Sequence, residues 1–276
     1  MRVSCRLPEP ALAFLRALSP LLLAAALAAT PANAAAPAAS PAAAPAVAAA
    51  SDLQFALAEI ATAFTLDTGQ DVRLAFGSSG NFRRQIAQGA PFELFLSADE
   101  TYVDALAAEG RTADRGVRYA TGRIVLLVPA GSPLKLDPTL ADLKSAASDG
   151  RVTRFAIANP EHAPYGRAAR EALQRAGAWD AIGPRLVLGE NVSQAAQFAT
   201  SGSAQGGIFA YSLALSPAFA GKGAYVLLPV ASHAPLHQRM VLMKGAGAAA
   251  RAFYAYLQQP AARAVLRKYG FLLPDE

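Results

Sequence analysis

Residues 72–100 read VRLAFGSSGNFRRQIAQGAPFELFLSADE, a segment in which two apolar runs enclose a helical pattern. The run Val72–Phe76 is typical of a buried strand, and Leu94–Leu96 is typical of a second one. Between them, Phe82 and Ile86 are spaced as on one face of a helix. A strand, a helix and a strand in this order predict a βαβ unit, which places two parallel strands in one sheet.

The same alternation continues on both sides of this segment. Before it, the short apolar run Val47–Ala50 precedes an apolar helical stripe that extends from Leu53 to Phe64. After it come further strand-like runs, which are Ile124–Pro129, Phe155–Ala158, Leu186–Leu188, Ile208–Tyr211, Val226–Val230 and Met240–Met243. So many strands in a chain of this length favour an α/β protein with two lobes over one large sheet.

The N-terminal part of the chain has a different character. Of 276 residues, 53% are hydrophobic, and 25 Lys and Arg stand against 20 Asp and Glu. Three arginines lie in the first sixteen residues, before the apolar run 17–29, and the small residues of a cleavage site follow at 32–34. This order predicts a secretory signal peptide over residues 1–34, because the apolar run is too short to span a bilayer. Residues 35–46 contain repeated prolines and are predicted to form a flexible leader.

Composition and charge exclude several classes of protein. Removal of residues 1–34 takes away three arginines, one glutamate and the only cysteine, and leaves a net charge of +3. A chain without cysteine forms neither a disulfide nor a cysteine-based zinc site. Its basic residues are scattered, so nucleic acid is not an expected partner. No later segment is apolar over the length of a membrane span, so we expect a soluble exported protein.

Motifs typical of enzymes are incomplete. The sequence has no phosphate loop and no dinucleotide-binding glycine fingerprint after a strand. Residues 77–81 resemble a nucleophile elbow, but Asn81 stands where that motif has its second glycine. A secreted serine hydrolase that used Ser78 or Ser79 would need a histidine nearby. The sequence has three histidines, His162, His233 and His237. All three are expected in loops distant from these serines.

A repeated arrangement of residues at helix starts points to binding instead. Ser51, Ser79, Tyr165 and Val192 each stand where a strand-like run gives way to a helical pattern. A helix start presents backbone N–H groups and a partial positive charge, which favour a small anion. In a parallel sheet all such starts meet at the carboxyl edge of the strands, where ligands bind. The bland interpretation is that they cap helices, with Gln54 completing a capping box at Ser51.

Five segments of the chain resemble one protein family, the periplasmic molybdate-binding proteins of molybdate ABC transporters. They are AAASDLQFALAEIA at 48–61, FGSSGNFRRQIAQGAPFELFLSAD at 76–99, ANPEHAPYGRAAREALQRAGAWD at 158–180, GENVSQAAQFATSG at 189–202 and AFYAYLQQPAARAVLRKYGF at 252–271. The resemblance implies a type II-like periplasmic-binding-protein fold, in which two mostly parallel sheets flanked by helices are joined by a hinge. It implies lobe I at 47–121 plus 236–276 and lobe II at 122–235.

The resemblance also implies a ligand and the residues that hold it. The expected event is hinge closure around molybdate, and around tungstate as well, without catalysis or a cofactor. The family's serine hydroxyls fall on Ser51 and Ser79, its ligand-binding amides on Tyr165 and Val192, and its tyrosine hydroxyl on Tyr211. All of them contact the oxyanion, so no direct ligand of a metal ion is expected. Because Tyr211 stands one residue later than in the family pattern, the hydroxyl of Tyr165 is the alternative.

Asp52 departs from the family pattern. A carboxylate repels an anion, so Asp52 is expected to face away from the site or to serve the helix start. Another tetrahedral oxyanion, such as sulfate, remains an alternative ligand. Phosphate is the least favoured, because its protonated form needs an acceptor and the implied groups are all donors. The expected partner is the membrane permease of the transporter, and the expected state is a periplasmic monomer.

Overall fold

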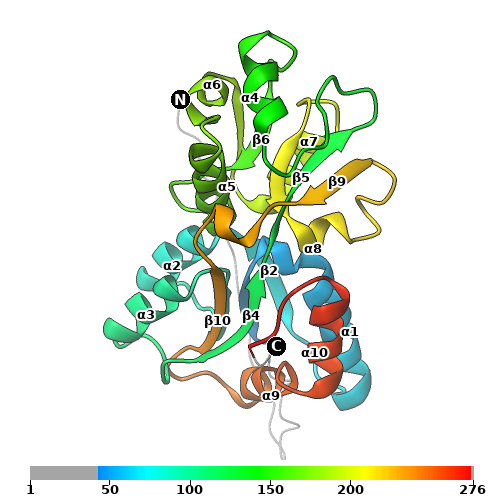
Figure 1. Ribbon diagram of the computed structural model, residues 1–276. Coiled ribbons are helices and arrows are strands. Elements are labelled where there is room, and N and C mark those ends of the chain that lie inside the picture. The colour runs from blue at the N-terminus through cyan, green and yellow to red at the C-terminus, as the bar shows by residue number, and fades with distance from the viewer. Residues whose placement is uncertain (1–42, 275–276) are drawn as a thin grey trace, which may run out of the picture. The chain divides into compact units, whose positions relative to one another are not determined.

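The computed structural model describes residues 43–274. The predicted signal peptide and most of the predicted leader lie outside these residues. Ten described strands form two five-stranded sheets, each flanked by helices (Figure 1). The predicted α/β fold with two lobes is confirmed.

The first sheet has the strand order β2–β1–β3–β10–β4. β1 pairs in parallel with β2 and β3, whereas β10 runs antiparallel to both of its neighbours, so only β10 points the other way. Its strands are β1 (Ala46–Ala50), β2 (Arg73–Gly77), β3 (Leu94–Ser97), β4 (Val117–Gly122) and β10 (Leu236–Leu242). Its helices are α1 (Gln54–Thr68), α2 (Ser79–Ala87), α3 (Glu100–Ala108), α9 (Ala248–Tyr256) and α10 (Pro260–Lys268), with the 3-10 turn η1 (Ser51–Leu53) before α1.

The second sheet repeats this plan with the order β7–β6–β8–β5–β9. β6 pairs in parallel with β7 and β8, and β5 is the one reversed strand. Its strands are β5 (Ile124–Pro129), β6 (Phe155–Ala158), β7 (Leu186–Gly189), β8 (Gly207–Ala210) and β9 (Gly223–Leu227). The helical elements of this lobe are α4 (Ala141–Ser148), α5 (Pro164–Arg175), α6 (Trp179–Ile182), η2 (Gly183–Arg185), α7 (Val192–Thr200), α8 (Tyr211–Ala214) and η3 (Val230–Ser232).

Apolar residues on both faces explain why the strands read as continuous apolar runs. In β1, Val47 and Ala49 join the cluster formed with α1, α9 and α10, whereas Ala48 joins the cluster formed with α2 and α3. The two helix layers lie on opposite sides of the sheet in Figure 1. Successive side chains of a strand point to opposite faces, so a strand covered on both faces is apolar at every position.

The chain passes between the two sheets at two places. Only Arg123 separates Gly122, the last residue of β4, from Ile124, the first residue of β5. The return segment runs from β9 through η3 to β10, as the orange part of Figure 1 shows. Two crossings of this kind are the structural basis of hinge motion in two-lobed binding proteins.

Three strands differ from the sequence prediction, and one of them, β9, lies at Gly223–Leu227 instead of Val226–Val230. β4 was not expected, because its sequence VRYATG mixes Arg118 and Thr121 with apolar residues. β10 begins at Leu236 instead of Met240, because its first half alternates buried and partly buried residues and the buried residue at 238 is a glutamine. β4 and β10 are recognised by their mutual antiparallel pairing, which no local pattern reveals.

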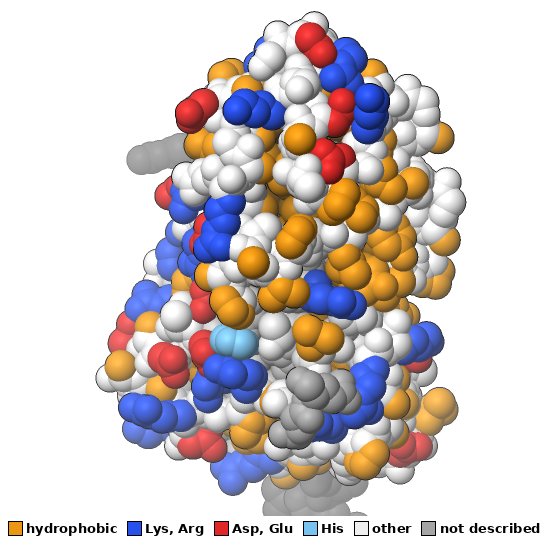
Figure 2. Space-filling model, in the orientation of Figure 1, with side chains coloured by type: hydrophobic (Ala, Val, Ile, Leu, Met, Phe, Trp, Pro, Cys, Tyr) orange, Lys and Arg blue, Asp and Glu red, His pale blue; other side chains and the backbone are white. Residues whose placement is uncertain are grey.

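Within residues 43–274, no helix has both the length and the apolar content for crossing a membrane. On the face shown in Figure 2, Lys and Arg side chains are interspersed with Asp and Glu. Apolar side chains gather on the upper right of the same face.

Candidate functional site

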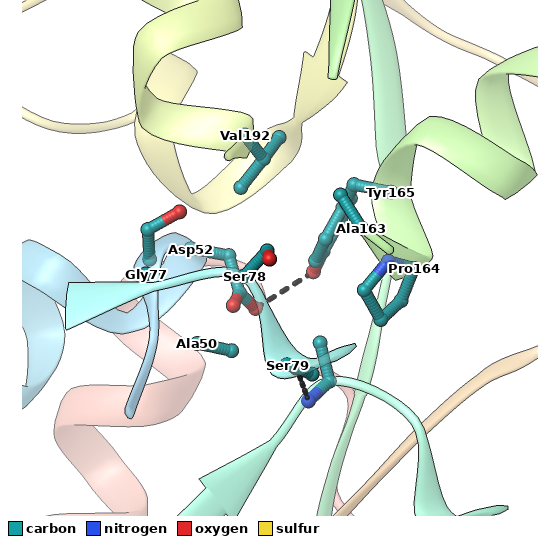
Figure 3. Close-up of a pocket in the computed structure, with 11 residues that line it drawn as sticks. Ala50, Asp52, Gly77, Ser78, Ser79, Ala163, Pro164, Tyr165 and Val192 are labelled. Atoms are coloured by element: carbon teal, nitrogen blue, oxygen red, sulfur yellow. Dashed lines mark hydrogen bonds between the residues drawn. The ribbon is translucent and has the colours of Figure 1, made fainter. Parts of the chain in front are cut away.

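A small cavity lies between the strand ends of the first lobe and the helix starts of the second. Its empty volume, which includes space open to solvent, is about 180 Å³. The first lobe contributes residues that follow β1, β2 and β3, and the second contributes the first residues of α5 and α7 (Figure 3). The lining residues are Ala50, Ser51, Asp52, Gly77, Ser78, Ser79, Ala98, Ala163, Pro164, Tyr165 and Val192.

Four of the five residues predicted to bind the ligand line this one cavity. Ser51 and Ser79 come from the first lobe, and Tyr165 and Val192 come from the second. The topology brings them together, because all four stand at the carboxyl edges of parallel strands. Their role toward a ligand stays a prediction.

Tyr211 is not brought to the cavity. It opens α8, and its ring centroid lies 5.9 Å from that of Tyr225. The guanidinium of Arg123 lies over the same ring, 4.8 Å from its centroid. The one-residue offset from the family pattern therefore coincides with a side chain packed elsewhere. The tyrosine that does reach the cavity is Tyr165 (Figure 3).

Of the three serines that line the cavity, Ser51 and Ser79 accept hydrogen bonds from backbone amides. Ser79 Oγ accepts a hydrogen bond of 3.0 Å from Ala98 N, and Ser51 Oγ accepts one of 3.3 Å from Ser193 N. A hydroxyl that accepts in this way keeps its own hydrogen for a further acceptor. Ser51 makes no side-chain cap bond, so the expected capping box with Gln54 is not formed. Both serines are buried.

Three helices begin at the cavity wall. α2 begins at Ser79, α5 begins at Pro164, and α7 begins at Val192. The side chain of Asn191 caps α7 by accepting a hydrogen bond from Gln194 N at 3.1 Å. The first N–H groups of each helix lack an intrahelical acceptor, and the helix dipole makes this end partly positive. The wall therefore attracts an anion without any lysine or arginine in it.

Asp52 does not face away from the cavity, so the first sequence expectation is wrong. The backbone N–H groups of Asp52 and Leu53 in η1 act on its carboxylate, in line with the alternative expectation that it serves the helix start. Asp52 is 1% exposed, and its Oδ2 accepts hydrogen bonds from Tyr165 Oη at 2.8 Å and from Gln238 Nε2 at 2.7 Å. These donors come from α5 and β10, which the sequence alone could not bring next to η1. Oδ1 has no hydrogen-bond partner among the described groups. Burial raises the pKa of Asp52 to about 6, against the opposing effect of the hydrogen bonds from Gln238 and Tyr165.

The hydrogen bonds of Asp52 belong to a buried network next to the first crossing. Gln238 Oε1 accepts a hydrogen bond of 2.6 Å from Tyr119 Oη, and Gln238 Nε2 lies 3.0 Å from Tyr165 Oη. A Cβ atom at Gly122 would lie 2.2 Å from Tyr165 Oη, so the glycine permits this approach. Burial raises the pKa of Tyr165 well above its ordinary value, and the charge of Asp52 acts in the same direction.

Ser78 contacts a histidine that the sequence placed far from it. Ser78 Oγ lies 2.9 Å from His162 Nδ1, and His162 Nε2 lies 3.6 Å from Glu190 Oε2. The expectation that every histidine lies in a distant loop was therefore wrong for His162. The loop of His162 reaches the start of α2, where Gly80 N donates a hydrogen bond of 3.0 Å to His162 O. The order of ring nitrogens is the reverse of that in a serine protease triad.

The donor set of the cavity consists of hydroxyls and backbone amides. Asp52 is the only charged residue in the lining. Within residues 43–274, no three His, Cys, Asp or Glu side chains form a cluster that could hold a metal ion. Such a cavity can bind a small anion through neutral hydrogen-bond donors.

Comparisons with known proteins agree with this geometry. A family model described as bacterial extracellular solute-binding protein matches residues 45–272. The chain is 39% identical to the molybdate-binding protein ModA of Rhodobacter capsulatus, over 78% of this chain and 82% of the relative. It is 35% identical to the molybdate-binding protein ModA of Escherichia coli, over 82% of this chain and 87% of the relative.

Solved structures share the fold. The periplasmic molybdate-binding protein of Azotobacter vinelandii matches with a TM-score of 0.74 and 29% identity, over 83% of this chain and 99% of that one. The sulfate-binding protein SubI of Mycobacterium tuberculosis matches with a TM-score of 0.68 and 18% identity, over 84% of this chain and 87% of that one. The second likeness is one of fold alone.

Proposed function

The chain belongs to the bacterial extracellular solute-binding proteins, and we propose that it captures molybdate, and tungstate as well, for an ABC transporter. The observation that carries the proposal is the cavity of about 180 Å³, in which neutral donors from both lobes converge. The similarity to molybdate-binding proteins of two bacteria, at 39% and 35% identity, supports the choice of anion.

In this proposal the oxyanion is held by groups from four chain segments. The hydroxyls of Ser51 and Ser79 donate from the first lobe, and the amides of Tyr165 and Val192 donate from the second. Hydrogen bonds to a charged group contribute roughly 1.5–3 kcal/mol each. Four or more of them support micromolar affinity or better. Tyr211 is left out of the set, because its ring packs outside the cavity.

Hinge closure brings the binding residues of the two lobes together. We take lobe I as 47–121 plus 236–276 and lobe II as 122–235, since the chain changes sheets next to Gly122 and before Leu236. Contacts between the halves surround the cavity, and in one of them Ser193 Oγ donates to Ser51 O at 2.8 Å. Ser212 Oγ donates to Asp52 O at the same distance, 2.8 Å.

The proposal includes export and a partner. Residues 1–34 are removed as a signal peptide, the protein acts as a monomer in the periplasm, and it delivers its ligand to the membrane permease of the transporter. Mass spectrometry of the exported protein should find Ala35 as its first residue. An exported chain that still begins at Met1 would contradict this part of the proposal.

We propose no catalytic activity for the chain and no cofactor. The contact of Ser78 with His162 is the one observation that favours a serine hydrolase, at 2.9 Å between Oγ and Nδ1. The carboxylate of Glu190 lies next to Nε2 of His162, whereas the carboxylate of a triad lies next to Nδ1. The side chain of Glu190 is also 62% exposed. Hydrolysis of a small ester should therefore be no faster with the wild-type protein than with Ser78→Ala.

Calorimetry of the purified protein against molybdate, tungstate and sulfate tests the main proposal. Molybdate and tungstate, which are similar in size, should bind alike. The smaller sulfate leaves donors without acceptors, at roughly 1–3 kcal/mol for each. Sulfate should therefore bind at least about a hundredfold more weakly. Equal affinities for sulfate and molybdate would favour a general oxyanion receptor instead.

A further inference from the structure

Asp52 places a hydrogen-bond acceptor in a cavity whose other assigned groups are donors. One carboxylate oxygen is used, because Oδ2 accepts from Tyr165 and Gln238. The other oxygen, Oδ1, is buried and accepts no hydrogen bond of good geometry among the described groups, although the backbone N–H groups of Asp52 and Leu53 act on the carboxylate and lower its pKa. A buried polar atom without a partner is costly, so such an atom in a cavity wall points to a ligand that satisfies it.

Within residues 43–274, no positive side chain compensates the charge of Asp52. The groups that face its carboxylate are Tyr165 on α5, Gln238 on β10, Tyr119 on β4 and the backbone N–H groups of Asp52 and Leu53 on η1, and all of them are neutral at neutral pH. The basic group of the neighbouring wall, His162, is engaged by Ser78 and Glu190. An ionised Asp52 beside a bound oxyanion would therefore repel it across a short distance, with little solvent to screen the repulsion.

We propose that this site takes up its oxyanion together with one proton, which lies between Asp52 Oδ1 and an oxygen of the anion. The inference rests on the proposed function, since it places an oxyanion in this cavity. A fully deprotonated anion such as molybdate draws the proton from solvent onto the carboxyl group, which then donates to the anion. An anion that already carries a proton, such as hydrogen phosphate, donates to the ionised carboxylate instead.

This assignment removes the sequence argument against phosphate. The groups implied by the sequence are all donors, whereas Asp52 supplies the acceptor that a protonated anion requires. The burial that already raises the pKa of Asp52 to about 6 favours its neutral form. A neighbouring dianion acts in the same direction. At pH 8 the carboxyl group is therefore ionised in the free protein and protonated in the molybdate complex.

The test is calorimetry at pH 8 in two buffers that differ in ionisation enthalpy, with molybdate and tungstate as ligands. The wild-type protein should take up about one proton per anion bound, and its affinity should fall roughly tenfold per pH unit between pH 7 and pH 9. Asp52→Asn is isosteric and cannot ionise, so it should bind molybdate without proton uptake and with a flat pH profile. Asp180→Asn, on the exposed surface of α6, is the matched control and should behave like the wild type.

Each outcome bears on one of the two proposals. Binding of molybdate by the wild type without proton uptake and without pH dependence overturns the inference about Asp52 and leaves the proposed function intact. Failure of both proteins to bind any oxyanion overturns the proposed function. If Asp52→Asn does not fold by circular dichroism, the proton count of the wild type decides alone.

A phosphate titration at pH 8 separates the two sources of the proton. Uptake of about one proton with molybdate supports delivery from solvent. Phosphate binding without proton uptake, lost in Asp52→Asn while molybdate binding persists, supports a proton carried by the ligand. The shared proton is contradicted if phosphate binds equally to the wild type and to Asp52→Asn and if molybdate binds to the wild type without proton uptake.

Discussion

At the scale of single residues, the cavity serines are donors whose direction is set by the backbone. Ala98 N occupies a lone pair of Ser79 Oγ, and Ser193 N occupies one of Ser51 Oγ. The hydroxyl hydrogens remain for the ligand, and little ordering is left to be done upon binding. Ser78 differs, because its hydroxyl is engaged with His162.

Ser79→Ala should weaken molybdate binding by roughly ten- to a hundredfold, because it deletes one hydrogen bond to a charged ligand. It should also lower stability by about 1–3 kcal/mol, because Ala98 N loses its buried acceptor. Ser78→Ala is the matched control and should weaken binding less. Calorimetry and thermal melting separate the two effects. A Ser79→Ala protein that melts earlier but binds like the wild type would show that Ser79 is structural only.

Asp52 should make the ligand-free protein less stable as the pH rises. Its pKa is about 6 in the folded chain against an ordinary value of 3.8, so the folded state holds the proton more tightly. The stability from this group is complete below about pH 4 and is lost as the pH rises through about 6. The difference amounts to roughly 3 kcal/mol. Urea unfolding at pH 4 and pH 8 should show this loss in the wild type and not in Asp52→Asn. The same loss in both proteins would contradict the assignment.

At the scale of elements, the start of α2 meets the loop before α5 at very short range. Gly80 N donates to His162 O, and a Cβ atom at Gly80 would lie 2.6 Å from that same oxygen. Gly80 belongs to α2 in the first lobe and His162 belongs to the second, so this glycine governs how closely the lobes approach each other. Within α2 itself an alanine would be better tolerated than a glycine.

Gly80→Ala should therefore weaken molybdate binding while the melting temperature of the ligand-free protein stays the same or rises. The added methyl group clashes with backbone only across the lobe boundary, since its close neighbour within the first lobe, Tyr102 Oη at 3.0 Å, is the end of a side chain that can shift. The helix gains up to about 1 kcal/mol from the better helix former. Gly183→Ala is the control, because a Cβ atom there meets nothing within 4 Å. Unchanged affinity in Gly80→Ala would mean that the ligand does not require this close approach.

At the scale of the whole molecule, the described arrangement is a closed one. Ser51, Asp52, Ser79 and Tyr165, from both lobes, are each no more than 3% exposed. We expect the lobes to separate when a ligand enters or leaves, because the walls that both lobes contribute are buried. Two crossings, one of them a single residue between β4 and β5, permit such a movement without unfolding either sheet.

Small-angle X-ray scattering should show a smaller radius of gyration when molybdate is added to the ligand-free protein. The ligand binds groups of both lobes and therefore shifts the population toward the closed form. Gly80→Ala should contract less at the same degree of saturation, because its lobes cannot approach fully. A radius that is unchanged by saturating molybdate in the wild type would contradict hinge closure.

The α/β class, the two lobes and most strand positions could be predicted from the sequence, because these depend on local periodicity. The sequence also located four helix starts that line the cavity, since a helix that follows a parallel strand begins at a known edge of the sheet. Ser51 and Val192 belong to different lobes, yet each is recognisable from its own neighbours in the chain. Strand β4 could not be predicted, because it forms by pairing with β10 and its own composition is not typical of a strand.

Which side chains meet in the cavity depends on tertiary packing and could not be predicted from the sequence. Asp52 enters its wall because Tyr165 and Gln238, distant in sequence, donate to its Oδ2. His162 reaches Ser78 because a loop of one lobe packs on a helix of the other. Tyr211 is drawn to Tyr225 and Arg123 instead of the cavity. Each outcome depends on the relative position of segments from different strands, and the hydrophobic pattern of a single segment holds no record of that position.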